Sequence, residues 1–229
     1  MFDGQEASNW EDGRKNATKP MRERLILAAI DEIEEVGFER FSVRRVAGAC
    51  GASCAAPYKH FKNKREFFEE ILRYINGVWL ERQERILVRL ADKPLRQKLV
   101  ELAVDYIRFM VENPRFRSIL MIKDATFDVD YLQIKSEISA CSKELIRLYC
   151  EEVGMPPAVA KIKMYVVRSL IYGASLMFGN CELNYDERTL NYVRATIERE
   201  FDLPWTFGLD ADVPEDERRS FSDVFYGRA

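Results

Sequence analysis

The sequence contains only one histidine, His60, among its 229 residues. Many metal centres and acid–base pairs need at least two histidines, or a set of cysteines and histidines, and this chain cannot supply them. A ferritin-like di-iron bundle is also excluded, because it requires a Glu-x-x-His step on two helices. Cys50 and Cys54 lack a second cysteine pair, so no zinc site is expected. We therefore predict no metal centre.

Other signatures of enzymes are absent from the sequence. It contains no Gly-rich phosphate loop and no nucleophile elbow. The adjacent carboxylates Glu69/Glu70 and Glu151/Glu152 do not face each other on a helix, so solvated surface explains them better than acid–base chemistry. We predict that the protein is not an enzyme and needs no cofactor.

Long apolar runs and export signals are missing as well. The longest apolar run, Met164–Phe178, is interrupted by Arg168 and is too short to span a bilayer comfortably. The first residues, MFDGQEASNWEDGRKN, lack the apolar centre of an export signal. The five cysteines are odd in number and lie within helical patterns, which suits free thiols. We expect a cytoplasmic protein that does not bind membranes.

Glycine and proline are scarce, with 11 and 8 residues, and no useful stretch alternates as a strand does. Apolar residues recur at steps of three and four instead, as Ile26, Ala29, Ile30 and Ile33 do. This period predicts an all-α fold. The expected helices cover residues 20–36, 43–50, 54–61, 64–86, 94–112, 114–123, 134–153, 157–178 and 186–201, with a loop at Phe127–Tyr131.

Charge is divided unevenly along the chain. Residues 14–65 carry 12 Lys/Arg against 6 Asp/Glu, a net charge of +6, whereas residues 66–229 carry 23 against 28, a net charge of −5. Residues 1–13 add four acids and no base. The chain therefore joins a basic module to an acidic body, and the basic module suits a nucleic-acid partner.

The stretch Phe41–Lys64, FSVRRVAGACGASCAAPYKHFKNK, has the features of two short helices and a tight turn. Ser42 is a good N-cap for the first helix, and Gly51 supplies the turn because it lacks a Cβ. Ser53 should cap a third helix, CAAPYKHF, which Pro57 keeps short by removing a helical hydrogen bond. Asn63 and Glu66 form a capping-box pattern at the start of a long fourth helix.

A known family shares this pattern. The residues Ala28-Ala29, Gly37-Phe38, Ser42-Val43, Val46-Ala47, Gly51, Ser53, Tyr58, His60-Phe61 and Lys64 resemble the N-terminal DNA-binding domain of TetR-family transcriptional regulators. The resemblance covers roughly residues 20 to 75. Two positions depart from the family pattern: Ala52 stands where a larger aliphatic residue is usual, and Pro57 stands where leucine is commoner.

The resemblance implies an architecture and a function. A three-helix N-terminal helix-turn-helix domain would be joined through a long fourth helix to a larger helical domain for ligand binding and dimerisation. Together with the composition, it gives a mobile arm (1–18), a DNA-binding domain (19–66), a ligand-binding and dimerisation domain (67–203) and an irregular tail (204–229). The protein would bind a palindromic double-stranded DNA operator as a homodimer, act as a repressor and be released by an apolar or aromatic small molecule.

The resemblance also assigns DNA contacts residue by residue. Ser42, Tyr58, His60 and Lys64 match positions that contact phosphate, and Arg44, Cys54, Ala55 and Lys59 match positions that face base edges. Plainer alternatives stay open. His60 could serve only as a hydrogen-bonding group at a helix end, Tyr58 could be chiefly core, and Cys54 could be a small neutral contact or a redox switch.

Two sites are expected in the body. The helix over Met164–Phe178 is apolar around too much of its surface for a monomer, so we expect it to pair with its symmetry mate together with the helix at 186–201. Its predicted interface residues are Leu170, Gly173, Ala174, Met177, Tyr192 and Ile197. The predicted effector pocket is lined by Phe116, Met121, Phe127, Tyr131 and Tyr172, which could also be plain core. The alternative function is a helical protein–protein interaction module that does not bind DNA.

Overall fold

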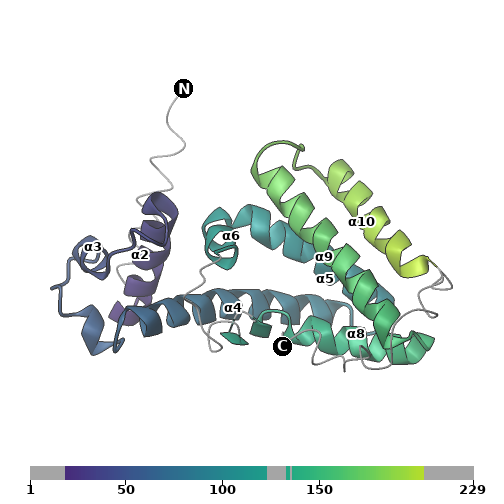
Figure 1. Cartoon of the computed structure of the whole chain (residues 1–229), viewed down its shortest axis with the longest axis horizontal. Helices are drawn as coiled ribbons and strands as arrows, with labels where there is room; N and C mark the ends of the chain where they lie inside the picture. Colours follow the sequence, from purple (N-terminus) through teal and green to yellow (C-terminus); the bar gives the residue numbers. More distant parts are fainter. Residues whose placement is uncertain (1–18, 123–132, 135, 204–229) are drawn as a thin grey trace. The chain divides into compact units, whose positions relative to one another are not determined.

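The computed structural model describes residues 19–122, 133, 134 and 136–203, and every regular element within them is helical (Figure 1). The predicted all-α fold is confirmed. The predicted arm (1–18), loop (Phe127–Tyr131) and tail (204–229) lie outside the described residues. The elements are α2 (Met21–Val36), α3 (Val43–Ala49), η1 (Pro57–Lys59), α4 (Lys64–Arg89), α5 (Leu95–Glu112), α6 (Pro114–Leu120), α8 (Ala140–Val153), α9 (Pro157–Gly179) and α10 (Glu187–Asp202).

Prolines and capping side chains mark several of the helix boundaries. α5 begins directly after Pro94 and ends at Asn113, whose N–H bonds to the Phe109 carbonyl. α10 begins after Asp186, whose carboxylate accepts the N–H of Thr189 at 2.7 Å. Such caps satisfy backbone groups that a helix end leaves unpaired. The predicted ends of these helices therefore agree with the structure to within one residue.

The helix predicted over 134–153 is interrupted in the structure: residues 133, 134, 136 and 137 are helical, residues 138 and 139 form a turn, and α8 begins at Ala140. Two serines precede it and bond backward to the backbone. The hydroxyl of Ser136 donates to the Gln133 carbonyl at 2.8 Å, and that of Ser139 donates to the Ser136 carbonyl at 2.9 Å. Serine side chains compete in this way with the backbone bonds of a continuous helix, which fits the turn at residues 138 and 139.

The chain divides into two compact units. Among the described residues, unit 1 contains 19–75 and 115–122, and unit 2 contains 76–114, 133, 134 and 136–203. The helix α4 contributes its first half to unit 1 and its second half to unit 2. The domain limits drawn from the sequence stay a prediction.

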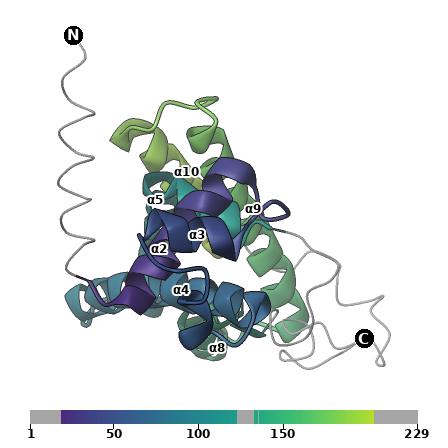
Figure 2. The ribbon, with the colours of Figure 1, turned by 90° about the vertical axis from the view of Figure 1, so that its left-hand side faces the viewer.

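Unit 1 packs around aromatic and aliphatic side chains of α2, α3 and α4. The predicted apolar face of α2 is confirmed, since Ile26, Ala29, Ile30 and Ile33 are all buried. α2 and α3 pack against each other (Figure 2). Phe38 meets Phe68 of α4 with ring centroids 4.4 Å apart. This core supports the turn that follows α3.

Unit 2 is built around α5. This helix packs against α8, α9 and α10, and α9 also packs along α10 (Figure 1). Its core contains Val100, Val104 and Ile107 of α5 together with buried side chains of the other three helices. The buried Lys163 of α9 donates to the Glu200 carbonyl of α10 at 2.5 Å, and the Glu200 carboxylate at 3.6 Å balances its charge.

Candidate nucleic-acid interface

The start of α3 is held by a serine cap and by one residue of α2. Ser42 has an extended backbone, and its hydroxyl accepts the N–H of Arg45. Glu32 of α2 accepts the Ser42 N–H at 3.3 Å and the Arg45 Nε–H at 2.6 Å. The predicted cap is confirmed. Arg45 is tied to α2, which leaves its neighbour Arg44 as the exposed, unpaired arginine of α3 among the described residues.

A left-handed glycine makes the turn after α3. Gly51 has φ +64°, its N–H bonds to the Gly48 carbonyl, and the Ala52 N–H bonds to the Ala47 carbonyl, each at 2.9 Å. This pair of bonds is a Schellman motif. Arg24 of α2 donates to the Cys50 carbonyl at 3.0 Å, which places a cation at the carbonyl end of the helix. The predicted turn at Gly51 is therefore confirmed.

The predicted third helix is shorter than expected. Within CAAPYKHF only Pro57–Lys59 is helical, as one 3₁₀ turn, and the residues before it form turns. In an α-helix the N–H of residue 57 would bond to the Ser53 carbonyl, but proline has no N–H. The Ala56 N–H bonds to Ser53 instead, at 2.9 Å. The short helix expected over CAAPYKHF is corrected to the single 3₁₀ turn η1.

The element η1 has an inner and an outer side. Pro57 is buried, and the next buried residue, Phe61, stacks on Phe67 of α4 with centroids 4.1 Å apart and planes 8° apart. Tyr58 is 57% exposed, and Lys59 and His60 are exposed beside it. This exposure excludes the alternative that Tyr58 is a core residue. The outer side of η1 therefore offers a phenol, an ammonium group and an imidazole to a partner.

The start of α4 adds further polar groups. Asn63 accepts the Glu66 N–H at 2.8 Å, and Glu66 accepts the Lys62 N–H at 2.6 Å, so the predicted capping residues are confirmed. The Lys64 ammonium lies 5.3 Å and 5.6 Å from the ring centroids of Phe41 and Phe38. Cation–π attraction thus holds this exposed lysine against unit 1.

The predicted DNA contacts come from one continuous surface stretch of unit 1. Ser42 is half-buried, and the other seven predicted residues are exposed: Arg44, Cys54, Ala55, Tyr58, Lys59, His60 and Lys64. Both sets, the phosphate contacts and the base contacts, thus lie between the start of α3 and the first turn of α4. Their contacts with DNA stay a prediction.

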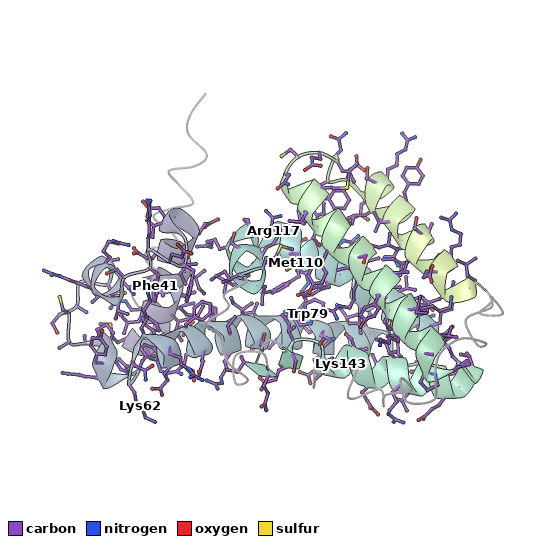
Figure 3. All side chains as sticks on the ribbon, viewed as in Figure 1. Phe41, Lys62, Trp79, Met110, Arg117 and Lys143 are labelled. Carbon is purple, nitrogen blue, oxygen red and sulfur yellow. The ribbon has the colours of Figure 1, made fainter. Side chains whose placement is uncertain are left out.

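The prediction from sequence missed three residues with a part in this surface. Lys62 is exposed, and its side chain points away from the helices (Figure 3). Its position between two predicted phosphate contacts, His60 and Lys64, was the available signal. Arg24 and Glu32 support the α3 region from α2, and only tertiary contacts reveal that role.

The two cysteines of this region differ in environment. Cys50 is buried and its thiol donates to the Arg24 carbonyl at 3.5 Å, whereas Cys54 is exposed. Burial raises the pKa of the Cys50 thiol, although the positive charge of Arg24 opposes that rise. Cys50 therefore stays protonated and does not act as a thiolate partner for Cys54.

The predicted dimer-interface residues occupy different environments in unit 2. Met177 of α9 and Tyr192 of α10 are 39% and 61% exposed, and Leu170 and Gly173 are half-buried. Ala174 and Ile197 are buried in the core of unit 2, so their side chains are not available to a partner. The exposed side of α9 instead carries Tyr165, Val166 and Leu176 in addition to Met177.

The predicted effector-pocket residues divide between the two units. Phe116 and Met121 are half-buried residues of unit 1, and Phe116 meets Tyr74 edge to face at 6.4 Å. Tyr172 belongs to α9 in unit 2, and the Arg168 guanidinium lies 5.9 Å from its ring centroid. Phe127 and Tyr131 lie outside the described residues. That these five residues line one pocket stays a prediction.

Unit 2 has an open depression of about 480 Å³, lined by Arg82, Asp105, Arg108, Glu112, Tyr185, Asp186, Glu187 and Leu190. Arg82 pairs with both carboxylate oxygens of Asp105 and with Glu112. These hydrogen bonds raise the pKa of Arg82, against the effect of burial. Burial, followed by the charge of Glu112, raises the pKa of Tyr185 to about 12. The arginines here already have carboxylate partners, so the depression does not suit an apolar effector.

Among the described residues, no group of three or more His, Cys, Asp or Glu could hold a metal ion. No helix in the described part of the chain is long and apolar enough to cross a membrane.

One family model matches the segment that holds the predicted DNA contacts. Residues 25–71 match the family model described as bacterial regulatory proteins, tetR family. The nucleoid occlusion factor SlmA of Klebsiella pneumoniae subsp. pneumoniae is 29% identical over 122 residues, which cover 52% of this chain and 60% of SlmA. The chain thus matches only about three fifths of the length of this relative.

Solved structures with the same fold cover more of the chain. The fatty acid degradation regulator FadR from Bacillus halodurans has a TM-score of 0.61 at 15% identity, over 80% of this chain and 94% of FadR. NalD, the secondary repressor of the MexAB-OprM multidrug efflux pump in Pseudomonas aeruginosa, has a TM-score of 0.54 at 22% identity, over 82% and 96%. The matched family is one of regulators and not of enzymes. The segment 25–71 therefore matches the TetR family of bacterial regulatory proteins, and the chain shares its fold with these solved structures.

Proposed function

We propose that this protein is a repressor that binds a palindromic operator as a homodimer and is released by a small molecule. The observation that carries the proposal is the exposed cationic surface from α3 to the start of α4. Within the described residues, the side chains of Arg44 and Lys59 make no hydrogen bond or ion pair with the protein. Both charges are therefore available for DNA, in the cytoplasm where the chromosome lies.

The residues of this surface suit two kinds of contact. Lys64 stands in the first turn of α4, where free N–H groups and the helix dipole favour a phosphate. We add Lys62 to the predicted phosphate contacts Ser42, Tyr58 and His60. Cys54 and Ala55 offer little hydrogen bonding to bases, so Arg44, Lys59 and the shape of the DNA should determine most of the specificity.

The proposed homodimer forms through α9 and α10. Tyr165, Leu176 and Met177 are exposed at helical spacing along α9, and Tyr192 is exposed on α10. A surface of this kind can pack against its own copy about a two-fold axis. Two DNA-reading elements in such a dimer must lie about 34–36 Å apart to enter successive major grooves.

Light scattering tests the homodimer directly. The chain of 26.8 kDa should elute at twice that mass, and Leu176→Asp combined with Met177→Asp should return it to the monomer mass. Val88→Asp is a matched control, because Val88 is 72% exposed on α4 and outside the proposed interface. A stable wild-type monomer at micromolar concentration would contradict the proposal.

The proposed effector is an apolar or aromatic molecule that binds in unit 2. The helix α4 continues from unit 2 into the DNA-binding unit, so a ligand that displaces α4 can change the spacing of the two reading elements. A near-complete switch requires the ligand to prefer one state by about 5.5 kcal/mol.

DNA binding is tested with the DNA that flanks the gene for this protein. Fluorescence anisotropy should show binding on the order of 10³-fold tighter than to random DNA of equal length, at physiological salt. Affinity should fall as salt rises, because bound Lys and Arg release counterions from the phosphates. The absence of a salt-sensitive and sequence-preferring signal would favour the protein–protein interaction module instead.

A further inference from the structure

The carboxylate of Glu32 joins α2 to the beginning of α3 within unit 1. Its side chain is 12% exposed, and its oxygen Oε1 accepts the Ser42 N–H at 3.3 Å and the Arg45 Nε–H at 2.6 Å. The Arg45 guanidinium also donates to the Arg40 carbonyl at 2.5 Å, so it contacts the chain before α3 as well. We call these three hydrogen bonds the Glu32 lock.

The first turn of α3 has few other supports. The helix has only seven residues, and helices of this length are not stable by themselves. Its buried apolar side chains hold the inner face, but apolar burial is not directional. The Ser42 hydroxyl accepts the Arg45 N–H at 3.5 Å, close to the longest distance of a useful hydrogen bond. The bond from Arg45 to Glu32 is shorter and charge-assisted, so it contributes more to the orientation of this turn.

Arg44 stands in this first turn, next to the arginine of the Glu32 lock. Its side chain is exposed and makes no hydrogen bond or ion pair among the described residues. The direction in which it leaves unit 1 is therefore set by the backbone of the turn. The guanidinium of Arg45 differs, because Glu32 holds it against α2. The Glu32 lock thus withholds one arginine from a partner and orients its neighbour.

We propose that Glu32 is the positioning residue for base reading by Arg44, and that it sets the operator preference without touching DNA. A bidentate contact between arginine and guanine requires the guanidinium to approach in one orientation. Loss of the Glu32 lock leaves every cation of the surface in place but releases the turn that directs Arg44. This inference rests on the proposed function, because it names a further specificity-determining residue of the same DNA-binding surface.

The test replaces Glu32 in the full chain and measures fluorescence anisotropy on operator and random DNA. Glu32→Gln keeps an oxygen for the Ser42 N–H but removes the charge that holds Arg45. Affinity for the operator should fall about tenfold, within the range for one base contact. Affinity for random DNA should not fall, because the change removes a negative charge and releases a cation near the phosphates. A folding defect would instead weaken binding to both kinds of DNA.

Asp31→Asn is the matched control for this change. Asp31 is the neighbouring carboxylate on α2, and it pairs with Arg115 of α6, outside the Glu32 lock. The control removes the same charge from the same helix, so the ratio of operator to random affinity should stay at its wild-type value. An equal fall of this ratio in both variants, or an unchanged ratio in Glu32→Gln, would overturn the proposal.

A double-mutant cycle shows whether Glu32 acts through Arg44. In Arg44→Ala the base contact is already lost, so adding Glu32→Gln should cause no further loss of operator affinity. Losses that multiply would place the action of Glu32 elsewhere and overturn the proposal. Circular dichroism checks folding. If Glu32→Gln does not fold, Arg45→Gln breaks the same ion pair from the exposed side of α3 and takes its place in the cycle.

The Glu32 lock is also measured without DNA. In nitrogen–proton NMR spectra, the Arg45 Nε–H of the wild type should exchange with water more slowly than that of Glu32→Gln. Equal exchange in the two proteins would overturn the proposal, whatever the DNA titrations give. A wild type that shows slow exchange but no sequence preference on DNA would defeat the proposed function instead. The two failures are therefore distinguishable.

Discussion

Both units pair arginines with carboxylates, and α3 of unit 1 also carries an exposed arginine without a partner among the described residues. In unit 2, Arg82, Arg108 and Arg194 each pair with a carboxylate on another helix. In unit 1, Arg45 pairs with Glu32, but its neighbour Arg44 has no partner among the described residues. A charge that is paired inside a unit helps to position its helices, and an unpaired exposed charge is available for a partner. Whether a charge is paired or exposed therefore indicates its role better than the net charge of the unit does.

The largest expected effect is on the free energy of unfolding, through an arginine of unit 2 that pairs with carboxylates. Arg82→Ala leaves Asp105 and Glu112 without their half-buried cation, so the free energy of unfolding should fall by about 2 kcal/mol, below the value for fully buried pairs. Urea denaturation at neutral pH measures it. Arg147→Ala is the control, because its pairs with Glu144 and Glu151 are exposed on one helix and should have no measurable effect. Equal losses of unfolding free energy in both variants would contradict the distinction between half-buried and exposed ion pairs.

Exposed lysines should affect DNA binding and leave stability unchanged. Lys59→Ala should change base preference, with a loss of about 1–3 kcal/mol on the operator and little loss on random DNA. Lys64→Ala should weaken binding to all sequences and reduce the salt slope by about 1. Anisotropy titrations at several salt concentrations distinguish them. Equal loss on operator and random DNA for Lys59→Ala would refute the base-contact assignment.

A matched pair of glycines tests the turn of unit 1. Gly51→Ala forces a residue with a Cβ into a left-handed conformation at φ +64° and should destabilise the protein by about 1 kcal/mol. Gly48→Ala lies within α3 and meets nothing within 4 Å, so it should stabilise the helix by about 0.5–1 kcal/mol. Thermal melts measure both. Changes of the same sign would show that the turn is not held as described.

The smallest expected effect compares two helix caps. Asp186 caps α10 in unit 2, and hydrogen bonds from the Thr189 N–H are the main cause that lowers its pKa. A lowered folded pKa means that the cap contributes stability above the unfolded pKa of about 3.9 and loses it as pH falls through the folded value. Asn63 caps α4 in unit 1 at a similar 2.8 Å but carries no charge.

Asp186→Asn should keep the cap, because an amide oxygen also accepts an N–H. It has no carboxylate to protonate, so the variant should lose less stability in acid than the wild type. Melting temperatures between about pH 6 and pH 3 would reveal this as a shallower decline than in the wild type. Asn63→Asp should produce the opposite change, a steeper decline. An unchanged pH profile in Asp186→Asn would contradict the assigned role of the carboxylate.

Local sequence rules predicted much of the fold and of the DNA-binding surface. The caps Ser42, Asn63 and Asp186, and the turn at Gly51, depend on bonds between residues at most five positions apart. The same rules identified Pro57 as a helix breaker but understated its effect, since η1 keeps only three residues. They also missed the turn at residues 138 and 139 that interrupts the helix before α8, because serine occurs both inside and before helices.

By itself, the sequence determined the helical period, the caps, the basic first module and the identity of the stretch Phe41–Lys64, because each depends on neighbours along the chain. Only the tertiary structure decided which side chains remain available. It buried Ala174 and Ile197, tied Arg45 to α2 and left Arg44 exposed. It also joined Asn76 to Ile134 across 58 positions of sequence. Helical periodicity shows which residues share a face, but only packing between distant segments decides what that face meets.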